Sequence, residues 1–213
     1  MPQDTPIVLV VDDDPSVREG LDSLFRSVGY QVACFGSVRE FTLFRRPDHP
    51  SCLVLDVRMP GPSGMDFQAE LAAIRDPTPI VFLTGHGDVP MAVRALKAGA
   101  IEFLLKPFRE QDLLDAVRKA IDTDIARRRS EAALAGLRAR FVSLSAREKE
   151  VMALVVQGRL NKQIAADLSL SEVTVKVHRG QVMRKMEAAT LADLIRLADQ
   201  LSGREGGRNP SRC

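Results

Sequence analysis

The chain has 213 residues, of which 45% are hydrophobic and 27% are charged, and its formal net charge is +2. This length suits one or two globular domains, each large enough to bury its own core. The longest apolar runs have the length of strands and no targeting segment is visible. We therefore exclude a membrane-spanning protein and expect a cytoplasmic protein without membrane partners.

Residues 1–123 alternate between short apolar runs and amphipathic stretches. Parallel strands that are buried on both faces are near-continuous in Val, Ile and Leu, and such runs occur at Ile7–Val11, Gln31–Phe35, Cys52–Leu55, Ile80–Leu83 and Ile101–Leu104. Helical periodicity follows each run, near residues 15–28, 37–46, 64–75, 88–98 and 109–123. Five strand-then-helix units predict an α/β doubly wound domain around a five-stranded parallel sheet.

The remaining residues have a different organisation. Residues 124–140 are rich in Ala and Arg and predict a linker that can continue the preceding helix. Residues 141–201 show only helical periodicity, which predicts an all-α domain of four helices. Residues 202–213 are rich in Gly, Arg and Ser and are expected to be disordered. The three cysteines show no metal-ligand spacing and are expected to be free thiols: Cys34, Cys52 and Cys213.

Side chains that commonly cap helices mark several of the predicted helix starts. In the first part of the chain Asp14 precedes Pro15, and proline is favoured at the first position of a helix. In the all-α part, a Ser-x-x-Glu capping box and two single caps are predicted, and a fourth helix is predicted to begin at a threonine. These residues are Ser145 with Glu148, Asn161, Ser171 and Thr190.

The charge is divided unevenly along the chain. Residues 1–123 carry 13 basic and 18 acidic side chains, a net of −5, whereas residues 124–213 carry 17 and 10, a net of +7. A basic second half indicates contact with a polyanion such as nucleic acid. A solvated basic surface would have the same composition, so charge alone leaves both interpretations open.

Polar side chains stand at the carboxyl ends of four predicted strands. In a doubly wound sheet the first and third strands are usually neighbours, and the functional crevice lies outside the carboxyl ends of the strands. Three clustered carboxylates need a counter-charge, and Mg²⁺ prefers oxygen ligands. A single residue of this kind is usually a turn or cap residue, but the whole set predicts a metal-bound phosphoryl group that is transferred onto a carboxylate. The set is Asp12, Asp13, Asp56, Thr84 and Lys106.

The motifs "VVDDD", "LDVRMPGPSG", "LTGHGD" and "LLKPF" occur in this order, and with them residues 1–123 resemble the receiver domain of two-component response regulators. The stretch "TGHGDVPMAVRALKAGA" is similar to FixJ-type regulators. The resemblance implies that a sensor histidine kinase transfers a phosphoryl group to Asp56. It also implies that Mg²⁺ is bound directly by Asp13, Asp56 and the backbone carbonyl of Arg58, and partly through water by Asp12.

The same resemblance implies roles for three further residues. Lys106 would contact the phosphoryl group, and its bond to Pro107 would be cis. Thr84 would move onto a phosphoryl oxygen, and Phe103 would be the aromatic residue that rotates with it. Phosphorylation adds about −1.5 to −2 charges and new acceptor oxygens, which gives such a movement its physical cause.

A capped helix, a short turn and a second capped helix in a basic segment indicate a helix-turn-helix. Residues 143–201 resemble the LuxR-type DNA-binding domain through "LSAREKEVMALV", "NKQIAADL" and "SEVTVKVHRGQVMRKM". The resemblance implies that Lys176 and Val177 face base edges. It implies contacts to phosphates or the groove wall for four further residues, Lys162, Thr174, His178 and Arg179.

One position departs from the family pattern. Gly180 stands where relatives such as NarL place a lysine that reads a base, so Arg179 or Gln181 are the alternatives for that contact. The alternative interpretation is an ordinary amphipathic helix with a solvated basic face and no role in DNA binding. Its core residues would then be Val173, Val177, Met183 and Met186.

Together the two resemblances imply a transcription regulator, usually an activator, and no enzyme beyond Mg²⁺-dependent phosphorylation and dephosphorylation of itself. They imply a homodimer on phosphorylation, bound to double-stranded promoter DNA and acting on RNA polymerase. The helix at 190–200 would supply a dimer contact or belong to the core. A phosphatase or phosphotransferase could use the same carboxylates, and a phosphorylation-controlled RNA-binding antiterminator would share the receiver. Neither accounts for the predicted recognition helix.

Overall fold

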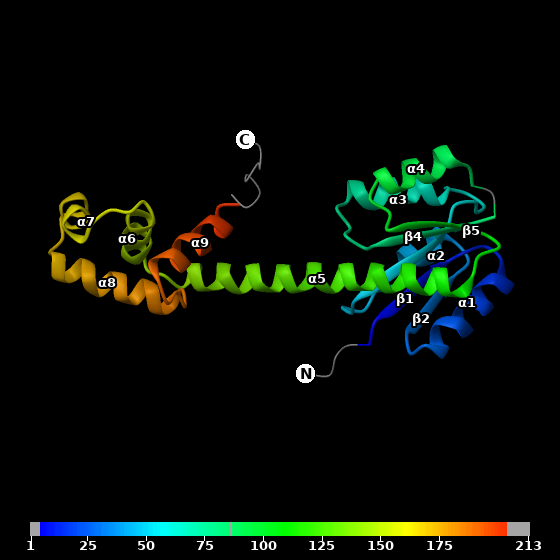
Figure 1. The fold of residues 1–213 in the computed structure, drawn as a ribbon, viewed down its shortest axis with the longest axis horizontal. Helices are drawn as coiled ribbons and strands as arrows, with labels where there is room; N and C mark the ends of the chain where they lie inside the picture. Colours follow the sequence, from blue (N-terminus) through cyan, green and yellow to red (C-terminus); the bar gives the residue numbers. More distant parts are fainter. Residues whose placement is uncertain (1–4, 86, 204–213) are drawn as a thin grey trace, which may run out of the picture. The chain divides into compact units, whose positions relative to one another are not determined.

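The computed structural model describes residues 5–85 and 87–203 (Figure 1). The chain divides into two compact units, residues 1–128 and residues 129–213. Within the described ranges, no helix is long and apolar enough to cross a membrane. Most of the tail predicted to be disordered, including Cys213, lies outside the described residues.

The first unit is built on a five-stranded parallel sheet with the order β2-β1-β3-β4-β5 (Figure 1). The sheet confirms the predicted α/β doubly wound class, and it confirms that the first and third strands are neighbours. The strands differ from the predicted runs by no more than one residue at either end. They are β1 (Ile7–Val11), β2 (Gln31–Phe35), β3 (Ser51–Asp56), β4 (Ile80–Thr84) and β5 (Glu102–Leu105).

A helix follows each strand, and the helices cover both faces of the sheet. Asp14 caps the first of them, accepting a hydrogen bond of 2.8 Å from the Ser16 N–H, with Pro15 at the first helical position. Ser63 and Asp66 form a capping box at the start of the third. The helices are α1 (Pro15–Ser27), α2 (Val38–Leu43), α3 (Gly64–Ala73), α4 (Val89–Lys97) and α5 (Glu110–Val142).

Alternate residues of each central strand enter two separate cores, which explains why the strands are apolar without interruption. Leu9, Leu53 and Phe82 lie in the core that is closed by α2, α3 and α4. Val10 and Val54 lie in the other core, which is closed by α1 and α5. Because both faces are buried, the only positions left for polar side chains are the strand ends.

Helix α5 includes all of residues 124–140, the predicted linker, and the predicted boundaries at 123 and 141 fall inside it. Within the first unit it is fixed by Asp124, whose carboxylate accepts hydrogen bonds from the Ser51 N–H at 3.0 Å and from Arg128 Nε at 2.8 Å. Burial acts to raise the pKa of Asp124. The hydrogen bonds from Arg128, Arg127 and Ser51 outweigh it, and the pKa lies below its ordinary value.

The second unit contains the end of α5 and four more helices that share one core. Buried residues from α5 and from all four helices contribute to it, among them Leu137, Val151, Ile164 and Leu194. Residues 129–203 contain no strand, which confirms the all-α prediction for this part. The helices are α6 (Ala146–Val156), α7 (Asn161–Leu168), α8 (Glu172–Lys185) and α9 (Leu191–Leu201).

Two of the three predicted caps in this unit are confirmed, since Ser145 forms the capping box with Glu148 and Ser171 caps α8. Thr190, predicted as the start of the last helix, is the N-cap of α9. The prediction for Asn161 is wrong, because it is the first helical residue of α7 and not its cap. The side-chain oxygen of Gln163 accepts from the Leu160 N–H at 2.9 Å, so this helix start is satisfied without an asparagine cap.

Helix α3 begins so close to the end of β3 that we expect a side chain at Gly64 to be destabilising. A Cβ at this position would lie 2.2 Å from the backbone oxygen of Asp56, which is far inside van der Waals contact. We expect Gly64→Ala to lower the free energy of unfolding by about 1–3 kcal/mol, because overpacking forces the backbone to shift. Urea unfolding followed by circular dichroism measures the change.

The matched control is Gly20→Ala in α1, where an added Cβ would meet nothing within 4 Å. This substitution is expected to stabilise the protein by about 0.5–1 kcal/mol through helix propensity alone. Equal effects of the two substitutions would contradict the close contact between α3 and β3.

Candidate functional sites: an acidic pocket and a basic helix face

Three carboxylates meet at one edge of the sheet. Asp12 follows β1 directly and Asp56 ends β3, and the strand register pairs Val11 with Leu55. Carboxylate oxygens of Asp12, Asp13 and Asp56 lie within 4.8 Å of one another. Asp12 and Asp56 are buried and Asp13 is exposed, so the cluster opens to solvent on one side.

One ammonium group lies among these carboxylates. Lys106 Nζ is 2.6 Å from Asp12 Oδ2 and 3.2 Å from Asp56 Oδ2. Lys106 follows β5 directly, and its backbone N–H donates to the Thr84 oxygen at 2.8 Å, which fixes it at the same edge. The peptide bond to Pro107 is cis, as predicted. The single lysine leaves the three carboxylates with an excess of negative charge.

Burial and the neighbouring charges act in opposite directions on the pKa values of Asp12 and Lys106. Burial raises the pKa of Asp12, and the nearby charge of Asp56 adds to the effect, although the hydrogen bond from Lys106 opposes it. Burial acts to lower the pKa of Lys106, but the hydrogen bond and charge of Asp12, with Asp56, raise it above its ordinary value. The hydrogen bond and charge of Asp12 therefore favour the charged form of Lys106, while burial disfavours the charged form of Asp12.

The donor set fits a hard divalent cation. Carboxylate oxygens are the ligands that Mg²⁺ takes, and it needs only one or two from the protein while it keeps several waters. The oxygens of Asp12, Asp13 and Asp56 are close enough to one another to share one ion. The backbone of Arg58 also reaches the pocket, since its N–H donates to Asp56 Oδ1 at 3.1 Å.

Thr84 and Phe103 lie beside this pocket on β4 and β5. Thr84 is fully buried at the end of β4. The Phe103 ring packs against the Phe82 ring with centroids 6.0 Å apart. Gly87 closes over the same ring, because a Cβ there would lie 2.7 Å from Phe103 Cε1. The segment after β4 is thus in direct contact with the aromatic side chain on β5.

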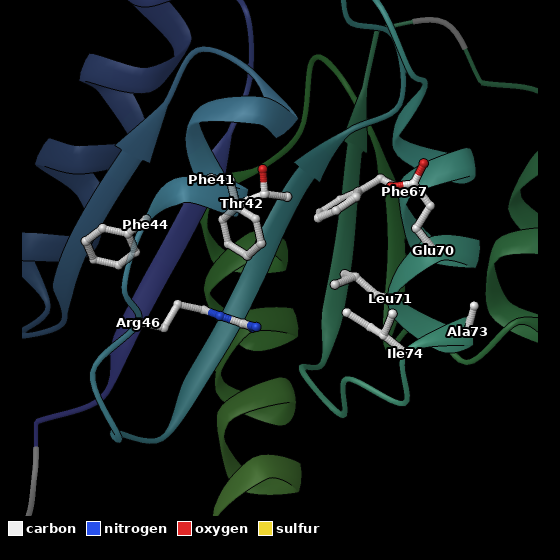
Figure 2. A pocket seen from close by; sticks show the side chains of 9 residues that line it. All are labelled: Phe41, Thr42, Phe44, Arg46, Phe67, Glu70, Leu71, Ala73 and Ile74. Atoms are coloured by element: carbon white, nitrogen blue, oxygen red, sulfur yellow. The ribbon is translucent and has the colours of Figure 1, made fainter.

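A separate cavity of about 480 Å³ lies between α2 and α3 (Figure 2). Its lining is mainly apolar, with Phe41, Phe44 and Phe67 around it, and it shares no residue with the acidic pocket. Arg46 lies with its guanidinium carbon 5.4 Å from the Phe41 ring centroid and donates to Thr78 Oγ1 at 2.8 Å. The clustered carboxylates, and hence the predicted chemistry, are in the acidic pocket and not here.

In the second unit, α7, a short turn and α8 form a helix-turn-helix. Val175, Val182 and Met186 bury one side of α8 in the core. Lys185 Nζ lies 2.6 Å from Glu148 Oε2 on α6, and Arg179 donates to Asn161 Oδ1 on α7 at 3.1 Å. The hydrogen bond from Lys185 holds the pKa of Glu148 below its ordinary value. These contacts fix α8 and leave its opposite side free.

The exposed side of α8 carries residues at helical spacing. Val173 is 71% exposed and Val177 is 57% exposed, which excludes both from the core. Lys176, Gly180 and Arg184 are exposed on the same side. Of the other predicted contact residues, Lys162 is exposed on α7, and four are partly buried: Thr174, His178, Arg179 and Gln181.

Comparison with known protein families covers both units. Residues 8–118 match the response regulator receiver domain family, and residues 142–198 match the luxR family of bacterial regulatory proteins. The chain belongs to the response regulators. The luxR match in the second half leaves the phosphatase and the RNA-binding alternatives without support.

Similar response regulators are known along most of the chain. Nodulation protein W of Bradyrhizobium diazoefficiens is 56% identical over 92% of this chain and 86% of its own length. Response regulator protein TmoT of Ectopseudomonas mendocina is 47% identical over 92% and 89%. Transcriptional regulatory protein FixJ of Azorhizobium caulinodans is 43% identical over 93% of both chains.

Solved structures agree with this assignment. The structure of response regulator StyR has a TM-score of 0.84 at 51% identity, and the match covers 92% of this chain and 99% of that one. Full-length FixJ from B. japonicum has a TM-score of 0.54 at 38% identity, with 92% and 97% covered. The response regulator described above therefore combines a CheY-like receiver with a LuxR-type DNA-binding unit, and its family regulates transcription.

The response regulator has three residues near its sites that sequence reasoning missed. Gly64 and Gly87 allow close backbone approaches, and only the "GPSG" and "TGHGD" motifs gave a hint of this. Val173 resembles a core residue in sequence, because its spacing from Val177 is that of a buried stripe. Its exposure is visible only in the folded unit.

The raised pKa of Asp12 predicts a gain in stability when its charge is removed. When folding raises the pKa of a carboxyl, its ionisation destabilises the folded state. This loss of stability begins as the pH passes the pKa of the unfolded chain, here near 3.8, and is complete above the pKa of the folded state. In the absence of divalent cations, Asp12→Asn should therefore be more stable than the wild type at neutral pH, and the difference should vanish in acid. Urea unfolding across pH measures it.

Asp14→Asn is the matched control, because hydrogen bonds from Ser16 lower the pKa of this exposed carboxyl and give the opposite sign. Added Mg²⁺ should stabilise the wild type more than Asp12→Asn. A less stable Asp12→Asn at neutral pH would contradict the unbalanced charge of the pocket.

Proposed function

We propose that this response regulator receives a phosphoryl group on Asp56 from a sensor histidine kinase and then binds promoter DNA as a homodimer. The observation that carries the proposal is the convergence of Asp12, Asp13, Asp56 and Lys106 at one sheet edge. It occurs in a chain whose second half is a LuxR-type DNA-binding unit. The acidic pocket supplies the chemistry and the helix-turn-helix supplies the output.

In the transfer, an Asp56 carboxylate oxygen attacks phosphorus, and the bond between phosphorus and the kinase imidazole nitrogen breaks with its electron pair returning to that nitrogen. Lys106, already 3.2 Å from Asp56 Oδ2, pairs with the new phosphoryl oxygens. Bound Mg²⁺ would neutralise charge on these oxygens, held by Asp13, Asp56, the Arg58 carbonyl and, through water, Asp12. Water attack on the acyl phosphate reverses the modification.

A groove next to the pocket suits the kinase. It has a volume of about 350 Å³ and is lined by apolar residues of α1, by Phe108 and by Lys106. Lys106 belongs to both the groove and the pocket, so a partner lying in the groove would stand directly beside Asp56. The apolar residues of α1 are Val17, Leu21 and Leu24.

The switch connects the pocket to the face formed by α4 and β5. Thr84 moves onto a phosphoryl oxygen and Phe103 rotates with it, which displaces the segment at Gly87 that covers the ring. Four apolar residues on this face are 43–77% exposed, and β5 is the edge strand of the sheet. We assign dimerisation to this face. The residues are Val89, Val93, Leu96 and Leu105.

On DNA, the exposed side of α8 enters the major groove. Lys176 and Val177 face base edges, and Lys162, Thr174 and His178 contact phosphates or the groove wall. Arg179 donates a hydrogen bond to Asn161 on α7, which supports a role for Arg179 in positioning α8. Gln181 is then the residue near Gly180 that contacts a base. The dimer acts in the cytoplasm on RNA polymerase, as an activator.

Asp56→Asn should abolish labelling by ³²P acetyl phosphate, because the amide oxygen cannot form the acyl phosphate. The measurement is acid-stable and base-labile counts on the full chain in Mg²⁺. Asp22→Asn, which changes an exposed carboxylate on α1, should label like the wild type. Retained label on the Asp56 variant would place the phosphoacceptor elsewhere.

Lys176→Ala should weaken binding to duplex DNA and make the slope of log K against log salt shallower by at most about 0.9, because one cationic side chain is removed from the DNA interface. Fluorescence anisotropy on the phosphorylated full chain measures both. Lys149→Ala is the control, since Lys149 Nζ lies over the Phe141 ring at 5.4 Å and not on the exposed side of α8. A duplex RNA of the same sequence should bind weakly. An unchanged salt slope would remove Lys176 from the interface.

A further inference from the structure

The exposed side of α8 holds two valines that the fold does not use. Val173 is 71% exposed and Val177 is 57% exposed, whereas Val175 and Val182 of the same helix are buried. Valine is a poorer helix former than alanine because its branched side chain is restricted in the helix. Neither helix propensity nor core packing therefore explains the two exposed valines.

The surroundings of these valines are polar and basic. Lys176 lies between them in sequence and Arg184 follows on the same side of the helix, while Glu172 is the one acidic residue of α8. Gly180, also on this side, presents no side chain, and a Cβ there would meet nothing within 4 Å. The two valines thus form a small apolar patch within a basic surface. Such a surface suits a polyanion that displays apolar groups and does not suit an apolar protein partner.

Duplex DNA is such a polyanion, because the thymine 5-methyl group is the apolar feature of the major groove. We propose that Val173 and Val177 recognise thymine methyl groups and thereby select thymine at two positions of each half-site. The proposal rests on the DNA-binding function proposed above, and it adds Val173 as a specificity residue.

Helix and DNA dimensions agree with a pair of contacts. Residues four apart lie on one side of a helix and are separated by about 6 Å along its axis. A recognition helix enters the major groove at an angle, and residues three or four apart on a zinc-finger helix contact successive bases. Val173 and Val177 can therefore reach thymines at neighbouring positions of one half-site. The missing side chain at Gly180 lets the helix backbone come closer to the base edges.

The test begins by selecting binding sites for the phosphorylated full chain from a pool of random duplex DNA. In the selected site, each thymine is then replaced by uracil, which removes only the methyl group. Uracil at two positions per half-site should weaken wild-type binding about fourfold each, the change that corresponds to one buried methyl group. Uracil at the other positions should have little effect.

Alanine variants assign the methyl groups to side chains. In Val173→Ala, uracil should no longer matter at one of the two positions and should still matter at the other, and Val177→Ala should show the reverse. Alanine is a good helix former and both positions are exposed, so the variants should fold. Val142→Ala, at an equally exposed valine at the end of α5, should keep both uracil effects.

The outcomes separate this inference from the proposed function. Selected sites without a common thymine, or sites at which uracil has no effect, would overturn the inference and leave DNA binding intact. Equal uracil effects in the wild type and in both alanine variants would also overturn it. Failure to select any duplex sequence would reject the proposed DNA-binding function, and the inference with it.

Discussion

The repulsion between buried carboxylates at one sheet edge is the constraint on which the receiver depends. Asp12 and Asp56 are placed there by neighbouring parallel strands, so the strand order that builds the core also brings like charges together. Lys106 pairs with Asp12 and Asp56, yet burial still raises the pKa of Asp12 above its ordinary value. The proposed cation and phosphoryl group would act on this cluster of like charges at the edge of a sheet that is buried on both faces.

Because both faces of the sheet are buried, few segments next to the pocket can change position without disturbing a core. The strands are apolar on both faces and cannot shift without disturbing two cores. Thr84 ends β4, and Phe103 lies on the edge strand β5, where it pairs with Phe82 of β4. The contact between Gly87 and the Phe103 ring places the segment before α4 next to this pair. In the proposed switch, a change of the Phe103 ring position would therefore act first on the segment before α4 and on the edge strand β5.

Much of this arrangement could be predicted from the sequence, because buried parallel strands are continuous apolar runs and functional residues follow them directly. The pocket residues can be predicted in this way, and the helix-turn-helix can be predicted from two helical segments separated by a short turn before Ser171. Properties that depend on contacts between distant segments could not be predicted. The cap assigned to Asn161 was wrong because Gln163 satisfies the helix start instead. The exposure of Val173 could not be read from a spacing that buried and exposed stripes share.

Gly180 lies on the exposed side of α8, opposite the residues that pack the helix into the core. Its core side is fixed by Val175, Val182 and Met186, while the centre of the opposite side is an atom-free position where a new side chain would touch no other residue. Glycine in a helix interior is about 1 kcal/mol less favourable than alanine, so replacing Gly180 would strengthen α8 and not weaken it. Under the proposed DNA-binding function, gene duplicates of this regulator can therefore change their target preference at this position without losing stability.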